Sequence, residues 1–261
     1  MTDRKILAIA AMCVVAAIGV TGCGNEKAQV SSAKQVTASA VPSPAPEPFA
    51  GMTPDQIADR ALDATKAANG LKAKGSSIEE GEKTPTDFDV AIAANGDCDG
   101  TATMKGANAS VRQVGTTGYL KGDAKLWETL LSEEGVPKAQ RAAAVEILKG
   151  RWVKVPAEDS ADEDFCDADD LTKPAEKQKT GLTKGANAEV GGKKTVVLTK
   201  TTPAGETIAF HVAAEGEPYL LKYSVEGGKD PRWVEFREFS TAVTVTAPSA
   251  EETTDLDKLG G

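Results

Sequence analysis

The chain has 261 residues, a net charge of -9, four cysteines and one histidine. The excess of acidic residues argues against nucleic acid as a partner, and a single histidine, His211, excludes metal sites that need two imidazoles. The 25 glycines and 13 prolines, together with only 5% aromatic residues, are typical of a turn-rich β protein or of a chain that contains a linker.

The chain begins with a targeting segment. Arg4 and Lys5 precede an apolar run over residues 6–20, which is shorter than the roughly 20 residues that a membrane-spanning helix needs. The run leads into Val20-Thr21-Gly22-Cys23, which resembles a bacterial lipoprotein signal: an aliphatic residue, two small residues and a cysteine. This resemblance implies cleavage before Cys23 and a diacylglycerol on its thiol, which would anchor the protein at the extracytoplasmic face of the cell membrane. An uncleaved signal anchor or an ordinary secretory signal is the alternative.

A tether is expected after the signal. Residues 1–22 would be the signal peptide and residues 23–52 a lipidated, disordered tether, because large apolar residues are sparse there and four prolines stand between residues 42 and 48. Such a composition cannot bury a hydrophobic core and favours an extended polyproline II conformation. The folded domain is then expected over residues 53–247, followed by an acidic tail over residues 248–261.

The folded domain is predicted to open with a helix. Thr53-Pro54-Asp55-Gln56 has the pattern of a capping box, with threonine as the N-cap, proline in the first turn and glutamine at the third helical position. Ile57, Leu62 and Ala68 lie on the narrow apolar stripe that follows, and Gly70 fits the end of the helix.

A first group of short strands is predicted after this helix. Apolar and polar residues alternate, most clearly at Phe88, Val90 and Ile92, which share one face. Turn signals that contain glycine or asparagine separate neighbouring strands. The expected strands cover residues 87–93, 101–105, 109–114 and 117–121.

A helical insertion is predicted to interrupt the strands. An amphipathic pattern between residues 126 and 131 predicts one helix, which ends near Gly135. Pro137 can open a second helix, which ends before Gly150. Residues 152–155 then return to a strand.

A second group of strands completes the domain. In one of them Tyr219, Leu221 and Tyr223 share a face, while Lys222 and Ser224 take the other. One apolar and one polar face per strand is typical of an antiparallel sheet that is solvated on one side. The expected strands cover residues 194–200, 207–213, 219–225, 233–239 and 242–245.

The order of these elements resembles that of a known group of lipoproteins. Gly118-Tyr119-Leu120-Lys121, followed later by Arg151-Trp152-Val153-Lys154-Val155, is similar to the LppX/LprA/LprF/LprG lipoproteins, and the resemblance spans residues 53–247. That family is similar in fold to the LolA/LolB lipoprotein carriers. The resemblance therefore implies an α+β fold, in which a strongly curved antiparallel sheet (a half-barrel) has helices packed on its concave face over an apolar cavity.

The same resemblance implies a function. It is that of an extracytoplasmic, membrane-anchored lipoprotein that binds or carries a lipid, a glycolipid or another apolar ligand at the cell envelope. The candidate cavity residues are Phe88, Val90, Ile92, Leu126, Leu130, Val196, Leu198, Ile208 and Phe210. The alternative for these residues is that they simply pack as the core. The alternative for the protein is a non-enzymatic lipoprotein that docks an envelope protein through its sheet or its acidic loop.

Two cysteines remain after the signal and the anchor are assigned. Cys98 and Cys166 lie in a chain expected to be exported to an oxidising space, so a disulfide between them is the default. The alternative is a pair of free thiols with a redox role, but acidic residues flank both cysteines and neither has a basic neighbour to lower its pKa. Cys13 falls inside the expected signal peptide.

An acidic stretch over residues 158–170 suggests a cation site. Asn95-Gly96-Asp97-Cys98-Asp99-Gly100 resembles the first half of an EF-hand loop, but Gly106 stands where that loop has its bidentate glutamate, so the motif fails. A disulfide would still bring the acidic stretch close to this segment. The weak candidates for calcium are Asp97, Asp99, Asp164 and Asp167. The alternative, a solvated acidic loop without metal, is favoured.

Catalytic motifs occur only as fragments. Ser31-Ser32-Ala33-Lys34 matches SxxK and Lys179-Thr180-Gly181 matches KTG, but no SDN lies between them and the first falls in the expected tether. His211 stands between two apolar strand residues and is expected to point outward. The sequence therefore predicts a protein that is not an enzyme and has no cofactor.

Overall fold

The computed structural model describes residues 47–78, 84–156 and 165–255. All of them belong to the second of the two compact units of the chain, Ala45–Gly261; the first unit, Met1–Pro44, lies outside the described residues. The expected signal peptide, Cys23 and most of the expected tether therefore carry no structural description.

The predicted first helix is confirmed. In α1 (Pro54–Lys66) the Thr53 side chain accepts a hydrogen bond from the Gln56 backbone N–H at 3.3 Å, and the Gln56 side chain accepts one from the Thr53 N–H at 2.9 Å. This reciprocal pair satisfies two backbone donors that the first turn would leave free. Phe49 and Met52, in the segment expected as tether, pack against the core, so the packed part of the chain begins a few residues before Thr53.

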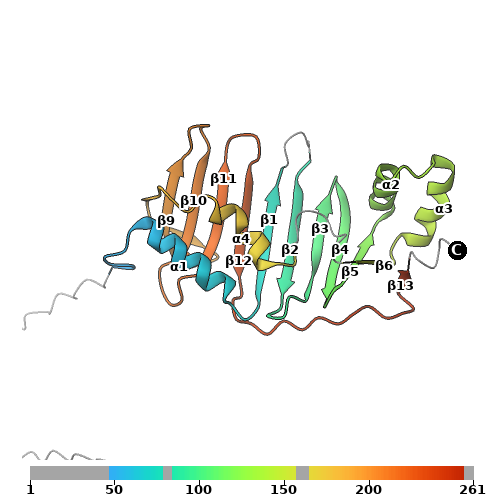
Figure 1. Ribbon diagram of the computed structural model, residues 1–261, viewed down its shortest axis with the longest axis horizontal. Coiled ribbons are helices and arrows are strands. Elements are labelled where there is room, and N and C mark those ends of the chain that lie inside the picture. The colour runs from blue at the N-terminus through green and yellow to red at the C-terminus, as the bar shows by residue number, and fades with distance from the viewer. Residues whose placement is uncertain (1–46, 79–83, 157–164, 256–261) are drawn as a thin grey trace, which may run out of the picture. The chain divides into compact units, whose positions relative to one another are not determined.

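The described residues form one large curved sheet that does not close (Figure 1). Its 13 strands follow the order β13-β6-β5-β4-β3-β2-β1-β12-β11-β10-β9-β7, with β8 also paired to β9. The strands are β1 (Leu71–Ser77), β2 (Thr86–Ile92), β3 (Cys98–Met104), β4 (Ala107–Val114), β5 (Thr117–Gly122), β6 (Trp152–Pro156), β7 (Thr183–Lys184), β8 (Ala188–Val190), β9 (Lys193–Thr201), β10 (Thr207–Ala213), β11 (Leu220–Glu226), β12 (Arg232–Arg237) and β13 (Thr253–Asp255). Neighbours pair antiparallel except β13, which pairs parallel with β6. The predicted α+β fold with a curved antiparallel sheet is confirmed.

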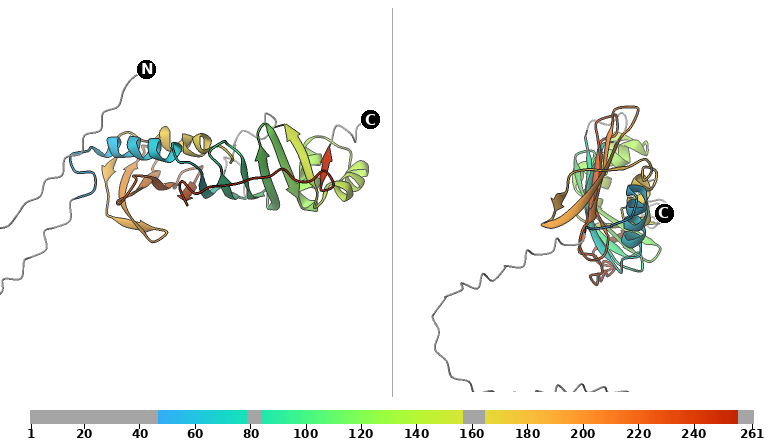
Figure 2. Two further views of the ribbon diagram at one scale, coloured as in Figure 1. Left: turned by 90° about the horizontal axis from the view of Figure 1, so that it is seen from below. Right: turned by 90° about the vertical axis from the view of Figure 1, so that its left-hand side faces the viewer.

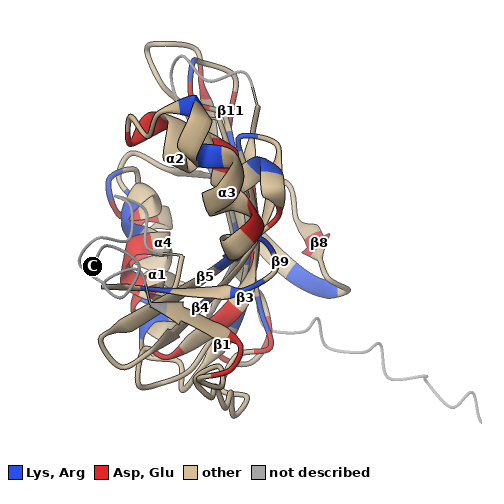
Figure 3. Cartoon of the chain, turned by 90° about the vertical axis from the view of Figure 1, so that its right-hand side faces the viewer, with Lys and Arg blue, Asp and Glu red and all other residues tan. Residues whose placement is uncertain are grey.

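The helices cover one face of this sheet. In addition to α1, the described residues form α2 (Ala124–Glu133), α3 (Lys138–Leu148) and α4 (Ala168–Glu176). The predicted helical insertion is thus present as α2 and α3. Helix α1 packs on β10 and β11 and against α4, while α2 packs on β4 and β5 and against α3. Figures 2 and 3 show these helices along the side toward which the sheet curves.

The strand register explains why both helix groups share that face. One row of paired residues crosses the strands from β2 to β5: Phe88, Ala102, Ala109 and Gly122. Because side chains alternate between faces along a strand, this row lies on a single face. Phe88 contacts the segment that leads into α4, and a Cβ on Gly122 would lie 2.4 Å from the side chain of Leu126 in α2. The glycine therefore lets α2 approach the sheet closely.

Strand β1 was not expected from the sequence. Its residues, LKAKGSS, include few large apolar side chains, so propensity and alternation are weak. Pairing on both sides, with β2 and with β12, forms this strand and joins the two predicted strand groups into one sheet.

The strand predicted at residues 242–245 is wrong. Strand β12 already has β1 and β11 on its two sides, so no edge is available beside it for another strand. Instead, Glu238 and Ser240 adopt left-handed backbone conformations and the chain runs past the ends of the strands to β13 (Figure 1). Arg112 holds this segment by donating from Nη1 to the Thr246 carbonyl at 3.0 Å. Three residues of the expected acidic tail thus form β13.

Candidate functional site

Helix α4 is attached to the sheet at its beginning by a disulfide. Cys98 opens β3 and Cys166 immediately precedes the helix, and their Cα atoms are 5.4 Å apart. Asp167 caps the helix by accepting a hydrogen bond from the Asp169 N–H at 2.8 Å. The disulfide expected from the sequence is confirmed, whereas α4 itself was not predicted, because its residues continue the acidic run and include Pro174.

Ion pairs and a hydrogen bond hold the other end of α4. The Glu176 carboxylate lies 2.7 Å from Lys66 Nζ of α1 and 2.9 Å from Lys179 Nζ, and Lys179 also pairs with Asp59 at 2.8 Å. These contacts lower the pKa of Glu176 and raise that of Lys179. The buried Tyr223 hydroxyl, whose pKa burial raises to about 12, donates to the Pro174 carbonyl at 3.2 Å. Helix α4 is therefore fixed at both ends.

The Glu176 ion pairs predict a pH dependence of stability. Hydrogen bonds from Lys66, and then from Lys179, depress the folded-state pKa of this carboxyl below its ordinary value of 4.5. Its stabilising contribution is therefore present above the unfolded-state pKa and is lost as the pH falls through the folded-state pKa. Glu176→Gln is expected to lower the free energy of unfolding by about 1 kcal/mol at pH 7 and to have a smaller effect at pH 3.

Urea unfolding at both pH values measures this difference. Glu215→Gln, which removes an exposed pair with Lys194, is the matched control and should change stability little at either pH. An equal loss at pH 7 and pH 3 in Glu176→Gln would show that the charge of this carboxylate does not hold α4.

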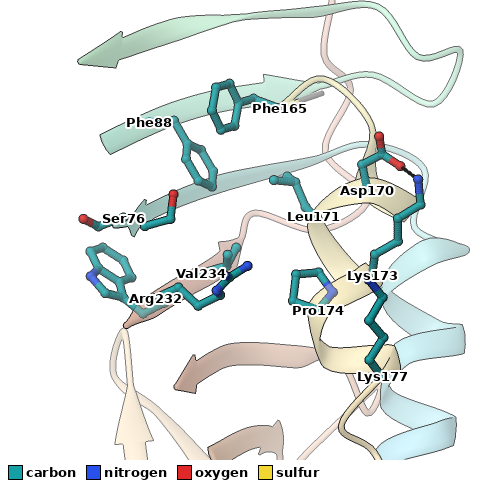
Figure 4. A pocket seen from close by; sticks show the side chains of 12 residues that line it. Ser76, Phe88, Phe165, Asp170, Leu171, Lys173, Pro174, Lys177, Arg232 and Val234 are labelled. Atoms are coloured by element: carbon teal, nitrogen blue, oxygen red, sulfur yellow. Dashed lines mark ion pairs between the residues drawn. The ribbon is translucent and has the colours of Figure 1, made fainter. Parts of the chain in front are cut away.

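Between its two fixed ends, α4 stands over a pocket. The pocket has a volume of about 220 Å³ and lies between α4, β1, β2 and β12 (Figure 4). Its lining residues are Ser76, Ser77, Phe88, Phe165, Asp170, Leu171, Lys173, Pro174, Lys177, Arg232, Trp233 and Val234. The chain thus provides an apolar hollow with charged residues around it, on the face of the sheet that the helices cover.

Two stacked phenyl rings form one end of this pocket. The ring centroids of Phe88 and Phe165 are 4.8 Å apart, and Leu171 lies beside them (Figure 4). Phe88 lies directly over Gly75, where an added Cβ would be 2.6 Å from the ring and 2.6 Å from the Trp233 carbonyl oxygen. Only glycine at this strand position leaves room for the ring, so Gly75 sets the depth of the pocket.

Charged residues surround the other part of the pocket. Lys173 pairs with Asp170 one helical turn earlier, and this hydrogen bond raises the pKa of Lys173. Lys177 follows one turn later on the same helix face, and Arg232 stands at the start of β12. The three cations and one carboxylate leave an excess of positive charge at the pocket, although the chain as a whole is acidic.

The structure separates the candidate cavity residues into several groups. Phe88 lines the pocket under α4, and Ile92 lines a second hollow of about 240 Å³ beside the disulfide. Phe88 and Ile92 also belong to the main core, together with Val90, Leu126, Val196, Leu198, Ile208 and Phe210, and Leu130 packs partly buried against it. Sequence reasoning missed Phe165, Leu171 and Arg232. The spacing of Ala168, Leu171 and Ala175, at positions i, i+3 and i+7, is a signal that could have indicated a helix over this hollow.

The candidate cation ligands have other partners. Asp97 accepts hydrogen bonds from the Gly115 N–H and the Asn95 side chain, while Asp99 pairs with Arg112 and Asp167 caps α4. Asp164 lies outside the described residues. In the described part of the chain, no group of three or more histidine, cysteine or acidic side chains is placed to hold a metal ion.

His211 lies on the opposite face of β10 from Phe210, as the alternation predicts. Its Nδ1 is buried without a hydrogen-bond partner in the described structure, and burial, followed by the nearby Lys222, lowers its pKa. The ring lies outside the pocket under α4.

None of the helices in the described part of the chain has the length and apolar character needed to cross a membrane.

Comparisons with known proteins identify the fold. No protein-family model and no curated protein matches the sequence. Among solved structures, LprF from Mycobacterium bovis is 15% identical with a TM-score of 0.50, and the match covers 78% of this chain and 100% of LprF. The lipoprotein LppX from Mycobacterium tuberculosis is 16% identical with a TM-score of 0.47, covering 74% of this chain and 97% of LppX. A LolA superfamily protein from Nitrosomonas europaea is 9% identical with a TM-score of 0.28, covering 75% of this chain and 96% of that protein.

The match to LprF shows that this chain has the LprF fold. It confirms the fold that the resemblance to the LppX/LprA/LprF/LprG lipoproteins implied.

Proposed function

We propose that this protein is a non-enzymatic lipoprotein of the cell envelope that binds or carries a lipid or another apolar ligand. The observation that carries the proposal is the pocket under α4, where Phe88, Phe165 and Leu171 offer an apolar surface on the helix-covered face of the sheet. A hollow with convergent apolar side chains and a few polar groups is the usual form of a small-molecule site.

The size of the pocket limits what it holds. Its volume of about 220 Å³ lies below the range of about 300–1,000 Å³ that is typical of ligand sites. One slender hydrocarbon chain fits such a space better than a bulky or branched group does. Each methylene that leaves water contributes about 0.8 kcal/mol, so even part of one acyl chain supplies useful affinity.

The ligand proposal is tested by extraction of the purified protein. The Cys23→Ala protein, which has no thiol to carry the anchor, is purified without detergent from a bacterial periplasm, and native mass spectrometry is compared with mass spectrometry of an organic extract. We expect a fraction of molecules with added mass and an acylated compound in the extract. Protein that is empty in repeated preparations, and that takes up no single-chain lipid when lipid is added, would contradict the proposal.

The membrane anchor is a separate proposal. The signal over residues 1–22 would direct export, and a diacylglycerol on Cys23 would hold the folded domain at the extracytoplasmic face through the tether. Two acyl chains give stable attachment where one gives only marginal attachment. An acidic protein gains no electrostatic help at an anionic membrane surface, so the lipid must provide the attachment.

Replacing Cys23 is expected to release the protein from the membrane. In Cys23→Ala the acceptor thiol is missing, so the protein should move almost entirely from the membrane fraction to the soluble fraction of lysed cells. Cys13→Ala is the matched control and should stay with the membranes, because Cys13 lies in the part that is removed. Cys23→Ala that remains membrane-bound after a high-salt wash, and whose mass shows that residues 1–22 have been removed, would show that lipid on this residue is not the anchor.

A further inference from the structure

We infer that the ligand under α4 is a single-chain amphiphile with an anionic head, a phosphate or a carboxylate, whose head lies against Arg232 and Lys177. This inference rests on the proposed function, because it names the chemical class of the ligand in the same pocket. It depends on the charges at the pocket and on where they stand relative to its apolar end.

The two cations lack carboxylate partners. In the described structure Lys173 is paired with Asp170, whereas neither Lys177 nor Arg232 forms an ion pair, and the Arg232 Nε–H donates only to the Asp230 carbonyl at a long 3.4 Å. Acidic residues outnumber basic ones by nine in this chain, so surface cations have many possible partners. Both cations at this pocket are therefore free to pair with an anion that enters it.

The cations come from two different walls of the pocket. Lys177 is the C-cap residue of α4, one turn beyond Lys173, and Arg232 comes from the start of β12, with Pro174 between them in Figure 4. An anionic head that reaches both would meet a lysine and the planar donors of an arginine. Arginine suits phosphate and carboxylate in particular, because its fork of N–H groups binds two oxygens at once.

A hydroxyl at the same pocket supports this assignment. Ser77 lines the pocket, and its Oγ is buried with no hydrogen-bond partner in the described structure. A buried hydroxyl without a partner is unfavourable, and an oxygen of a bound head group would accept its hydrogen bond.

The apolar end of the pocket indicates that the rest of the ligand is a hydrocarbon chain. Figure 4 shows the rings of Phe88 and Phe165 at one end, with Arg232 and Lys177 away from them. A chain that lies against the rings therefore presents its head to the cations. The small volume of the pocket favours one chain over two.

Three probes with the same chain separate the contributions of head and tail. Decyl phosphate, decanoate and decan-1-ol are titrated calorimetrically into the chain from residue 23 onward carrying Cys23→Ala, which keeps every described residue and lacks the apolar run over residues 6–20. We expect both anions to bind the protein about tenfold more tightly than the alcohol, because charge-assisted hydrogen bonds form only with the anions.

The double variant Arg232→Gln/Lys177→Gln should lose this preference for the anions and should bind decan-1-ol as before. Lys138→Gln is the matched control, because Lys138 is an exposed cation of α3 that does not line the pocket. This variant should keep the preference for the anions.

The outcomes distinguish this inference from the proposed function. If all three probes bind equally well to the unsubstituted and double-variant proteins, the anionic head is wrong and the apolar pocket stands. If no probe binds, the proposed function fails as well. Inorganic phosphate is a further arm: a free ion that binds as tightly as decyl phosphate would mean that the cations form a simple anion site, and it would overturn the amphiphile.

Discussion

Removing the Cys98–Cys166 disulfide is expected to lower the free energy of unfolding by about 4 kcal/mol. The bond closes a loop with a sequence separation of 68 residues, and the chain entropy that it removes from the unfolded state grows with loop length. Alanine is the better replacement at both positions, because Cys98 is fully buried and a serine hydroxyl there would lack a partner.

The same variant is expected to weaken ligand binding. The disulfide is the covalent link between β3 and the start of α4, and α4 forms one wall of the pocket. Without it, the Glu176 ion pairs, the Tyr223 hydrogen bond and the packing of Leu171 and Ala175 in the core still hold the helix, but no covalent link fixes its start over Phe88. Ligand retained on the purified protein, measured by native mass spectrometry, should therefore fall.

Urea unfolding of Cys98→Ala/Cys166→Ala measures the change in stability. Reduction of the unsubstituted protein is the control and should produce a similar loss. A change below about 1 kcal/mol, with ligand occupancy unaltered, would mean that neither the loop nor the position of α4 depends on the bond.

Gly75→Ala is expected to destabilise the protein by about 1–3 kcal/mol and to close the pocket. The added methyl group would lie 2.6 Å from the Phe88 ring and 2.6 Å from the Trp233 carbonyl oxygen. The carbonyl belongs to β12, which pairs with β1, so it cannot move without disturbing the sheet. The ring can move only away from the sheet, into the space that the ligand would occupy.

Gly185→Ala is the matched control for this prediction. A Cβ on Gly185 would have its nearest neighbours at 3.6 Å, which is ordinary van der Waals contact. This variant should keep both the stability of the unsubstituted protein in urea and its bound ligand. A Gly75→Ala protein that also keeps its stability and its bound ligand would show that the Phe88 ring does not form one end of the pocket.

Local patterns in the sequence predicted most of the regular elements. The capping box at Thr53 and Gln56 is confirmed. It could be predicted because its hydrogen bonds join residues only three positions apart in the sequence. The strands around Phe88 and Tyr223 and the helices around Trp127 and Val145 were predicted for the same reason, since apolar periodicity is visible within each segment.

Elements that depend on distant partners were missed. Strand β1 has weak propensity and exists because β2 and β12 pair with it. Helix α4 contains a proline and an acidic first turn, and it is held by Cys98, Lys66 and Tyr223, which come from three other elements. The strand predicted at residues 242–245 failed for the corresponding reason, because both sides of β12 were already occupied.

By itself the sequence determined the lipoprotein-like signal, the disulfide partners, the alternating strands and the capped first helix, because each depends on neighbouring residues or on a small set of cysteines. Only the tertiary structure decided which apolar residues form a pocket. Phe88 and Phe210 look alike in the sequence and both belong to the main core, yet of the two only Phe88 also lines the hollow under α4. The physical reason is that a glycine beneath Phe88 and a helix fixed at both ends above it leave space there, and no local pattern records the distance between two elements that meet only in the fold.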